Sequence, residues 1–301
     1  PRRGHPGLGR PIVSEARCLG FDEVPEDSSP PYDVVVFDCD STLADLEGID
    51  WLARNLSAAD LAKIESMTND AMNGVLGLEE VYGKRLELIA PKRQSMDELG
   101  KEYVRRMLPG AALLVDALYF LGKQVHIVSG GLQPGVLAIA TALGIDAQRV
   151  HAVDITFDQG GDYKGFDESS PLARRGGKPV VLAGIAQVSM APANVPTSRS
   201  ESSGQPGTAE TLGRAGITDT SAVDSDPPRR ICLVGDGLTD LEAAPVCARF
   251  VAFGGVIRRD AVFDRAIVPC EDRDLVALIP LLTSSEERTR LASAAPFVDL
   301  F

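Results

Sequence analysis

The chain has 301 residues, enough for a sizeable hydrophobic core and for one large or two small domains. Its composition, 44% hydrophobic and 24% charged, is ordinary for a globular protein. The net charge of −13 leaves no global basic surface, which disfavours nucleic acids and membranes as partners. A phosphorylated substrate would need a local positive site against this background.

The cysteine pattern and the hydropathy bear on the compartment. The five cysteines are odd in number and include no C-x-x-C pair, and Cys39 and Cys232 lie in strand-like runs. This pattern indicates reduced thiols in an intracellular, cytoplasmic protein rather than a disulfide framework or a zinc site. No apolar run approaches the roughly 18 residues of a membrane span.

The first predicted elements are an extension and a strand. Residues 1–31 are rich in Pro, Gly and charge without periodicity, which predicts a flexible N-terminal extension. A strand is predicted at residues 33–37, and it leads straight into Asp38 and Asp40. Neighbouring carboxylates beside a core are costly, so their position indicates a metal, a proton transfer or a nucleophile.

Residues 50–108 are predicted to be helical throughout. Ser57 with Asp60, and Ser95 with Glu98, resemble capping boxes at the starts of helices. Because the block follows the first strand directly, we expect it to form a small helical cap domain over the carboxyl end of that strand.

The rest of the chain alternates between strand-like and helix-like runs, which predicts an open, parallel α/β sheet with right-handed crossovers. This core would comprise residues 32–49 and 109–301. The predicted strands are residues 125–128, 231–234, 250–253 and 266–268, and the predicted helices are residues 110–122, 132–143, 179–188 and 240–247.

One long segment interrupts this core. Residues 187–228 are dense in Ser, Thr, Pro, Gly and Ala and hold almost no bulky apolar residues. Such a segment cannot bury enough surface to offset its chain entropy, so we predict a disordered insert. It precedes the amino end of the next strand, so we expect it to leave the chemistry unaffected.

Three predicted strands end in residues that suit catalysis. In open α/β sheets, ligands bind at the carboxyl ends of the strands, so these ends should converge on one site. Their carboxylates offer the hard oxygen ligands that Mg²⁺ prefers, and two carboxylates can divide the roles of nucleophile and proton donor. The pattern therefore predicts magnesium-assisted phosphoryl transfer. The three ends are Asp38-Cys39-Asp40, Ser129-Gly130-Gly131 and Gly235-Asp236-Gly237-Leu238-Thr239-Asp240.

A cation is also needed to hold the phosphoryl oxygens. Lys178, in the stretch Gly176-Gly177-Lys178-Pro179, precedes a predicted helix and is the candidate. A P-loop would need Ser or Thr after the lysine, so Pro179 argues against that motif. Each motif alone is weak evidence for a catalytic site; a lone lysine here, for example, is more often a solvated residue at a helix start. The prediction depends on the order in which all the motifs occur.

Arg85 falls in the middle of an apolar helical stripe. An inward-facing arginine needs an anion or a buried carboxylate. A substrate carboxylate would satisfy it, and so would an internal salt bridge with Glu79 or Glu80. The stripe is formed by Leu78, Val81, Tyr82 and Ile89.

The motifs F-D-C-D-S-T-L, S-G-G, G-G-K and G-D-G-L-T-D occur in an order that resembles the haloacid dehalogenase (HAD) superfamily. The helical insert after the first motif resembles the C1-type caps that cover the Rossmannoid sheet of that superfamily. DCDSTLADLEGID, AMNGVLGLEEVYGKRLELI, GFDESSP and VAFGG are similar to the phosphoserine phosphatase family in particular. The likeness runs from about residue 32 to residue 282, apart from residues 187–228.

The resemblance implies an activity and a set of core residues. The activity is Mg²⁺-dependent hydrolysis of O-phospho-L-serine to L-serine and phosphate, the last step of serine biosynthesis. Asp38 matches the nucleophile that forms an aspartyl phosphate. Asp40 matches the general acid/base, with its backbone carbonyl also ligating the metal. Asp236 matches a further metal ligand, and Asp240 supports the metal site.

The resemblance also implies substrate-binding residues in the core. Ser129 and Lys178 match the pair that holds the phosphate, and Gly130 and Gly131 lend backbone close to the ligand. Thr239 matches a position near the substrate.

In the cap region, Glu47 matches the carboxylate that faces the serine ammonium, and Arg85 matches the arginine that faces the serine carboxylate. Met72 and Asn73 match a substrate-lining pair, although the family commonly has Gly where Asn73 stands. From sequence alone, Glu47 would instead be a solvated loop acid.

Two alternatives stay open at this point. One is a HAD phosphatase or phosphotransferase for another small phosphomonoester, such as phosphohomoserine. The other is a non-enzymatic phospho-receiver, because an Asp at a strand end beside Mg²⁺ also serves signalling proteins. Asp40, Lys178 and the cap argue against a receiver. The expected partner is a small-molecule substrate, and a homodimer is compatible with the sequence.

Overall fold

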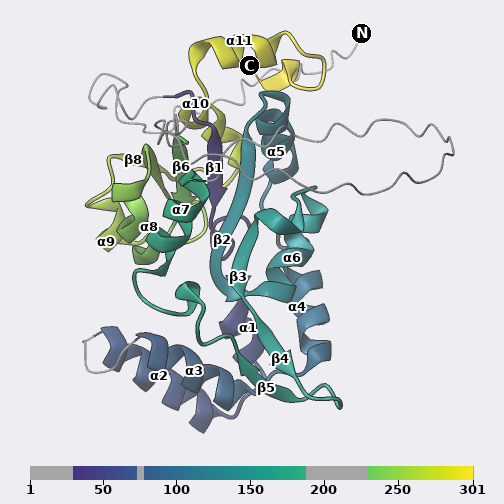
Figure 1. The fold of residues 1–301 in the computed structure, drawn as a ribbon, viewed down its shortest axis with the longest axis vertical. Helices are drawn as coiled ribbons and strands as arrows, with labels where there is room; N and C mark the ends of the chain where they lie inside the picture. Colours follow the sequence, from purple (N-terminus) through teal and green to yellow (C-terminus); the bar gives the residue numbers. More distant parts are fainter. Residues whose placement is uncertain (1–29, 73–77, 188–228, 301) are drawn as a thin grey trace, which may run out of the picture.

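A six-stranded sheet forms the centre of the computed structural model, which describes residues 30–72, 78–187 and 229–300. Its strands lie in the order β3-β2-β1-β6-β7-β8, and every neighbouring pair is parallel (Figure 1). The predicted parallel α/β fold is therefore confirmed. The strands are β1 (Val34–Phe37), β2 (Gln124–Leu132), β3 (Val150–Val153), β6 (Ile231–Gly235), β7 (Arg249–Phe253) and β8 (Val268–Cys270).

β1 is buried on both faces because it lies in the middle of the sheet. Val35 and Phe37 pack into the larger apolar cluster, and Val34 and Val36 pack into the cluster on the opposite face. A continuous apolar run is typical of such a strand. The register pairs Phe37 with residues of both neighbouring strands, so the chain segments that follow these strands start at the same edge of the sheet.

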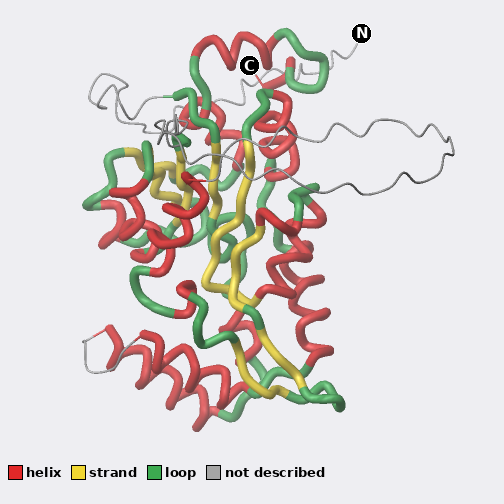
Figure 2. Tube along the Cα trace, in the orientation of Figure 1, coloured by secondary structure: helices red, strands yellow, loops and turns green. Residues whose placement is uncertain are grey.

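Helices cover both faces of the sheet (Figures 1 and 2). The larger apolar cluster includes side chains of α4, α5, α6, α10 and α11, and the smaller one includes side chains of α7, α8 and α9. On the first face lie α4 (Arg93–Arg105), α5 (Ala111–Phe120), α6 (Gln133–Ala142), α10 (Ile279–Leu282) and α11 (Ser285–Ala292). On the second face lie α7 (Gly177–Gln187), α8 (Leu238–Ala243) and α9 (Asp260–Phe263).

The remaining helices lie toward the carboxyl end of β1. They are α1 (Gly48–Ala53), α2 (Ala58–Met72) and α3 (Leu78–Ile89). Figure 1 shows α2 and α3 beyond the end of the sheet to which the arrow of β1 points. A two-stranded antiparallel sheet of β4 (Ile155–Phe157) and β5 (Tyr163–Phe166) packs against α3, where the rings of Tyr82 and Phe166 lie 5.2 Å apart.

The predicted helical block is divided in the structure. α4 packs along the core helix α6, and glycines make this approach close. A Cβ at Gly100 would lie 2.8 Å from the Cβ of Ala138, and one at Gly135 would lie 2.9 Å from Leu99. The boundary of a cap domain at residues 50–108 stays a prediction.

Several predicted boundaries were wrong. β2 continues through Ser129, Gly130 and Gly131 instead of ending before them, and the last strand lies at Val268–Cys270 instead of residues 266–268. β3, β4 and β5 were not predicted, because they have three or four residues each and two of them are only half-buried. Such short strands give no long apolar run.

The described residues allow some of the other predictions to be checked. No helix of residues 30–72, 78–187 or 229–300 is long and apolar enough to cross a membrane. Cys39, Cys232 and Cys247 are free thiols, as predicted. The extension at residues 1–29 and the insert at residues 188–228 lie outside the described residues.

The two ends of the insert lie side by side. The backbone N–H of Arg229 donates a 3.1 Å hydrogen bond to the carbonyl of Ala186, in the last turn of α7. A short connection can therefore join α7 to β6 without any change in the fold.

We expect a shortened insert to leave the fold intact. Replacing residues 190–226 with a Gly-Ser linker of about six residues should raise the free energy of unfolding by about 1 kcal/mol, because the loop to be closed is shorter. Urea unfolding followed by circular dichroism measures this, with a Gly-Ser segment of the original length as the control. A clear loss of stability in both variants would contradict the expectation.

Candidate active site

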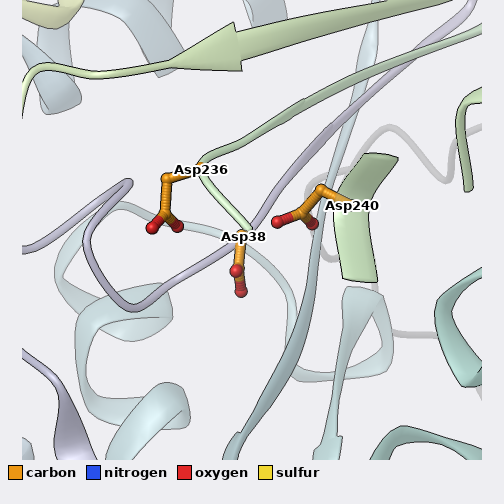
Figure 3. Close-up of side chains that lie close together, drawn as sticks. All are labelled: Asp38, Asp236 and Asp240. Carbon is orange, nitrogen blue, oxygen red and sulfur yellow. The ribbon is translucent and has the colours of Figure 1, made fainter. Parts of the chain in front are cut away.

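Three carboxylates gather at the edge of the sheet that the sequence predicted. Asp38 follows β1, Asp236 follows β6, and Asp240 lies in α8. One carboxylate oxygen from each residue lies within 4.8 Å of those from the other two. Figure 3 shows the three side chains close together. A Cβ at Gly235 would lie 2.2 Å from the Cγ of Asp240, so glycine is required there for Asp240 to reach the other two.

Lys178 is the counter-charge of this cluster. Its Nζ lies 2.8 Å from Oδ2 of Asp38 and 2.6 Å from Oδ1 of Asp240, and the side chain is only 5% exposed. Burial lowers the pKa of Lys178, but the two carboxylates outweigh burial and hold that pKa above its usual range. Lys178 is therefore a buried cation rather than a solvated helix start.

Arg259 forms a second cationic contact, which the sequence did not reveal. Its Nε donates to Oδ2 of Asp236 at 2.8 Å, and its Nη2 lies 3.1 Å from Oε1 of Glu47. Burial raises the pKa of Asp236 to about 6, and the neighbouring Asp38 charge adds to this while Arg259 opposes it. The only sequence signal for Arg259 was its position a few residues after the end of a predicted strand.

Asp40 has an environment quite different from that of Asp38. Its Oδ1 accepts a hydrogen bond from the Tyr103 hydroxyl, and its Oδ2 accepts one from the backbone N–H of Gly48 at 3.0 Å. Burial raises the pKa of Asp40 to about 8, and the charge of Glu47 adds to this although both hydrogen bonds oppose it. Asp40 therefore holds a proton at neutral pH, which a general acid requires.

Tyr103 was missed by the sequence reasoning. It lies on α4 and is fully buried, and a buried tyrosine hydroxyl usually needs a partner. A Cβ at Gly48 would lie 2.2 Å from the Tyr103 hydroxyl, so glycine at this position makes room for the contact with Asp40. The only signal in the sequence was a tyrosine on the buried face of a helix.

Glu47 is not the solvated loop acid that sequence alone favoured. Its Oε1 accepts from the Ser41 hydroxyl at 2.7 Å and also contacts Arg259. Burial raises the pKa of Glu47, while the hydrogen bond from Ser41 and the charge of Arg259 oppose the rise.

The S-G-G stretch lies inside β2. The hydroxyl of Ser129 is buried and accepts a 3.1 Å hydrogen bond from the backbone N–H of Gly131. The carbonyl of Gly130 accepts a 3.0 Å hydrogen bond from the Tyr82 hydroxyl, which ties α3 to β2. Thr239 is half-buried in the first turn of α8, beside Asp240.

Arg85 pairs with a residue that was not among its predicted partners. It forms an ion pair with Asp50 of α1 rather than with Glu79 or Glu80, and Glu80 pairs with Lys84 instead. Within the described part of the chain, the buried Nε of Arg85 has no hydrogen-bond partner, so the guanidinium keeps a donor for another anion. Of the pair predicted to line the substrate, Met72 ends α2 and Asn73 lies outside the described residues.

The three clustered carboxylates fit a divalent cation. They supply only oxygen donors, which hard cations prefer, and they carry more negative charge than Lys178 offsets. Asp40 was predicted to be a ligand through its backbone carbonyl, and its side chain does not belong to this cluster. Its predicted contribution through the backbone carbonyl stays a prediction.

The chain is similar to proteins of known activity. A phosphoserine phosphatase of Bos taurus is 32% identical over 78% of this chain and 87% of its own length. A phosphoserine phosphohydrolase-like protein of Francisella tularensis shares the fold, with a TM-score of 0.61 and 22% identity over 83% of this chain and all of its own. A solved structure of a phospho-aspartyl intermediate analogue of phosphoserine phosphatase has a TM-score of 0.57. It is 21% identical over 84% of this chain and all of its own length. No protein-family model matches this sequence.

Lys178→Met should destabilise the protein strongly. It would leave the carboxylates of Asp38 and Asp240 buried without their cation, at a cost of about 3–5 kcal/mol. The loss should be larger near pH 8 than at pH 5, because burial raises the pKa of Asp240 to about 7 and a proton on Asp240 removes part of the uncompensated charge.

Urea unfolding without added metal, at both pH values, measures this effect. Lys84→Met, which removes an exposed lysine of α3, is the control. An equal loss of stability at pH 5 and pH 8 would mean that lost packing rather than lost charge explains the effect.

Proposed function

The chain belongs to the phosphoserine phosphatase family, and from this we propose that it hydrolyses O-phospho-L-serine to L-serine and phosphate. The observation that carries the proposal is the contrast between two aspartates two residues apart. Asp38 is paired with the Lys178 ammonium, whereas Asp40 is half-buried and has a pKa raised to about 8, mainly by desolvation. One is suited to be the nucleophile and the other to be the general acid.

The reaction would proceed in two steps. In the first, a carboxylate oxygen of Asp38 attacks phosphorus and forms an aspartyl phosphate, while the bond from phosphorus to the seryl oxygen breaks. Asp40 donates its proton to that seryl oxygen, so L-serine leaves as an alcohol. In the second step, Asp40 takes a proton from water, and the water oxygen attacks phosphorus to release phosphate and restore Asp38.

Several residues would stabilise the phosphoryl group. Lys178 lies against Asp38 and can contact the phosphoryl oxygens as charge builds on them. Ser129 and the backbone of Gly130 and Gly131 are proposed to hold the same group, with Thr239 beside it. When bound by Asp38, Asp236 and Asp240, Mg²⁺ would polarise the phosphoryl oxygens and offset their charge.

Glu47 and Arg85 are proposed to select the amino acid. Glu47 would bind the serine ammonium, and Arg85 would bind the serine carboxylate through donors such as its unpartnered Nε. Asp50 holds the Arg85 guanidinium in place meanwhile. The cytoplasmic location and the homodimer stay predictions.

Asp38→Asn tests the proposed function directly. Phosphate release from phosphoserine should depend on Mg²⁺ and should fall by at least about a thousandfold in the variant, because an amide is no nucleophile toward phosphorus. A panel of small phosphate esters, including phosphohomoserine, should show a strong preference for phosphoserine.

Wild-type protein that becomes stably phosphorylated on Asp38 without turnover would instead favour a receiver. Phosphate release at similar rates from all the esters would agree with a HAD phosphatase but would contradict phosphoserine as the specific substrate. An acceptor assay with added homoserine separates hydrolysis from phosphotransfer.

Arg85→Ala and Glu47→Gln test the amino-acid contacts. Each should lower kcat/KM for phosphoserine by about 10- to 100-fold, the value of one or two charge-assisted hydrogen bonds. Turnover of propyl phosphate, which lacks both charged groups, should change little.

Lys84→Ala, on the same helix as Arg85 and paired only with Glu80 among the described residues, is the matched control. Equal losses on both substrates would show that these residues do not contact the amino acid.

Mg²⁺ binding should weaken in acid. A proton on Asp236 competes with the metal, and the pKa of about 6 places this competition below pH 6. This proton alone lowers the affinity for Mg²⁺ about tenfold between pH 7 and pH 5, and Asp240, whose pKa burial raises to about 7, should lower it further. Titration calorimetry at both pH values measures it, and Asp236→Asn should bind weakly at either pH. An affinity that does not change with pH would show that Asp236 is not a ligand.

A further inference from the structure

Apart from the site around Asp38, a polar cavity lies on the face of the sheet that α7 covers. It has a volume of about 480 Å³, and its polar wall includes Gln124 and His126 of β2, His151 of β3 and Arg229. Valines and Gly184 of α7 form the opposite, apolar side. Gln124 pairs with Val34 and His126 with Val36 of β1, and no residue of the Asp38 site lines the cavity. Three residues of strand, about 10 Å, separate His126 from Ser129.

The polar wall is a connected set of hydrogen-bond donors. Nδ1 of His126 lies 3.3 Å from Nε2 of His151, and Nε2 of His126 lies 3.4 Å from Oε1 of Gln124. Nη1 of Arg229 donates to the same Gln124 oxygen at 2.6 Å. Since that oxygen can only accept, His126 carries its proton on Nε2 and His151 donates to Nδ1 of His126. Arg229 and His126 therefore both donate to one amide oxygen, and His151 donates to His126.

Among the described residues, the cavity has one cationic side chain and no acidic one. The buried Nε of Arg229 has no hydrogen-bond partner within these residues, and no described Asp or Glu lines the cavity. Burial lowers the pKa of His126 to about 3, and the charges of Arg149 and Arg229 act in the same direction. Burial also lowers the pKa of His151, so Arg229 supplies the positive charge of this cavity.

We propose that this cavity binds a small organic anion. Its carboxylate or phosphoryl group would accept hydrogen bonds from Arg229, and its apolar body would lie against α7, near the imidazole pair. Both groups present oxygen acceptors to a guanidinium, so the shared chemistry is an oxyanion head on a short apolar chain. α7 carries Lys178 in its first turn, so the ligand would lie against the helix that holds the proposed catalytic lysine.

Gly184 allows the cavity to be blocked without touching its polar groups. A Cβ added to this glycine of α7 meets no other atom within 4 Å, so a larger side chain can extend into the cavity. Gly184→Ala adds only a methyl group, whereas Gly184→Leu should occupy the space next to Arg229.

Histidine NMR tests the proposal in the full chain with Mg²⁺ present. The chain has only three histidines, and the signals of His126 and His151 are assigned with His126→Gln and His151→Gln. Butyrate should shift both signals with a dissociation constant on the order of 1–10 mM, as expected for a small ligand with one charge. Butyramide has the same shape without the charge and should not shift them. Propylphosphonate, which a phosphatase cannot hydrolyse, shows whether a phosphoryl head replaces the carboxylate.

The variants distinguish a site from a general salt effect. Arg229→Gln should weaken butyrate binding about tenfold or more, as for the loss of a charge-assisted hydrogen bond. Gly184→Leu should abolish binding, and Gly184→Ala should keep it. Retained phosphoserine turnover shows that each variant is folded. Equal shifts with butyramide, unchanged binding in Gly184→Leu, or no shift from either anion at about 100 mM would overturn the proposal.

Discussion

The buried contact of Lys178 with Asp38 and Asp240 is the constraint on which the rest of the site depends. Carboxylates from β1, β6 and α8 lie within 4.8 Å of one another in a place with little water. Without a buried cation, their repulsion and desolvation would push them apart or protonate them. The ammonium comes from the first turn of α7, so the packing of that helix against the sheet holds the charges in place.

Asp38 and Asp40 are two residues apart, yet the fold gives them different partners. Asp38 lies beside an ammonium, while Asp40 lies against the Tyr103 hydroxyl, a backbone N–H and the charge of Glu47. The two side chains therefore have different electrostatic surroundings, which is what the proposed roles of nucleophile and acid require. The helices that supply Tyr103 and Lys178, α4 and α7, lie on opposite faces of the sheet.

The same helix connects two polar regions of the protein. α7 places Lys178 among the carboxylates with its first turn and forms the apolar wall of the cationic cavity with its following turns. The last turn bonds to Arg229, which belongs to that cavity. A single short helix thus contributes to the charge balance at one end of the strands and to an anion-accepting cavity nearer the other end.

Local signals along the chain were enough to predict some of the elements and groups. Apolar runs with polar ends predicted β1 and β6, and the order of the motifs predicted that Asp38, Asp236 and Lys178 would converge. Which side chains meet across the chain follows only from the packing of the folded protein. Tyr103 and Arg259 reach the site from elements 63 and 23 residues from the carboxylates they contact, and no local pattern marks them. Local periodicity reports the burial of a side chain, but only the packed fold supplies its neighbours, and those neighbours set its charge.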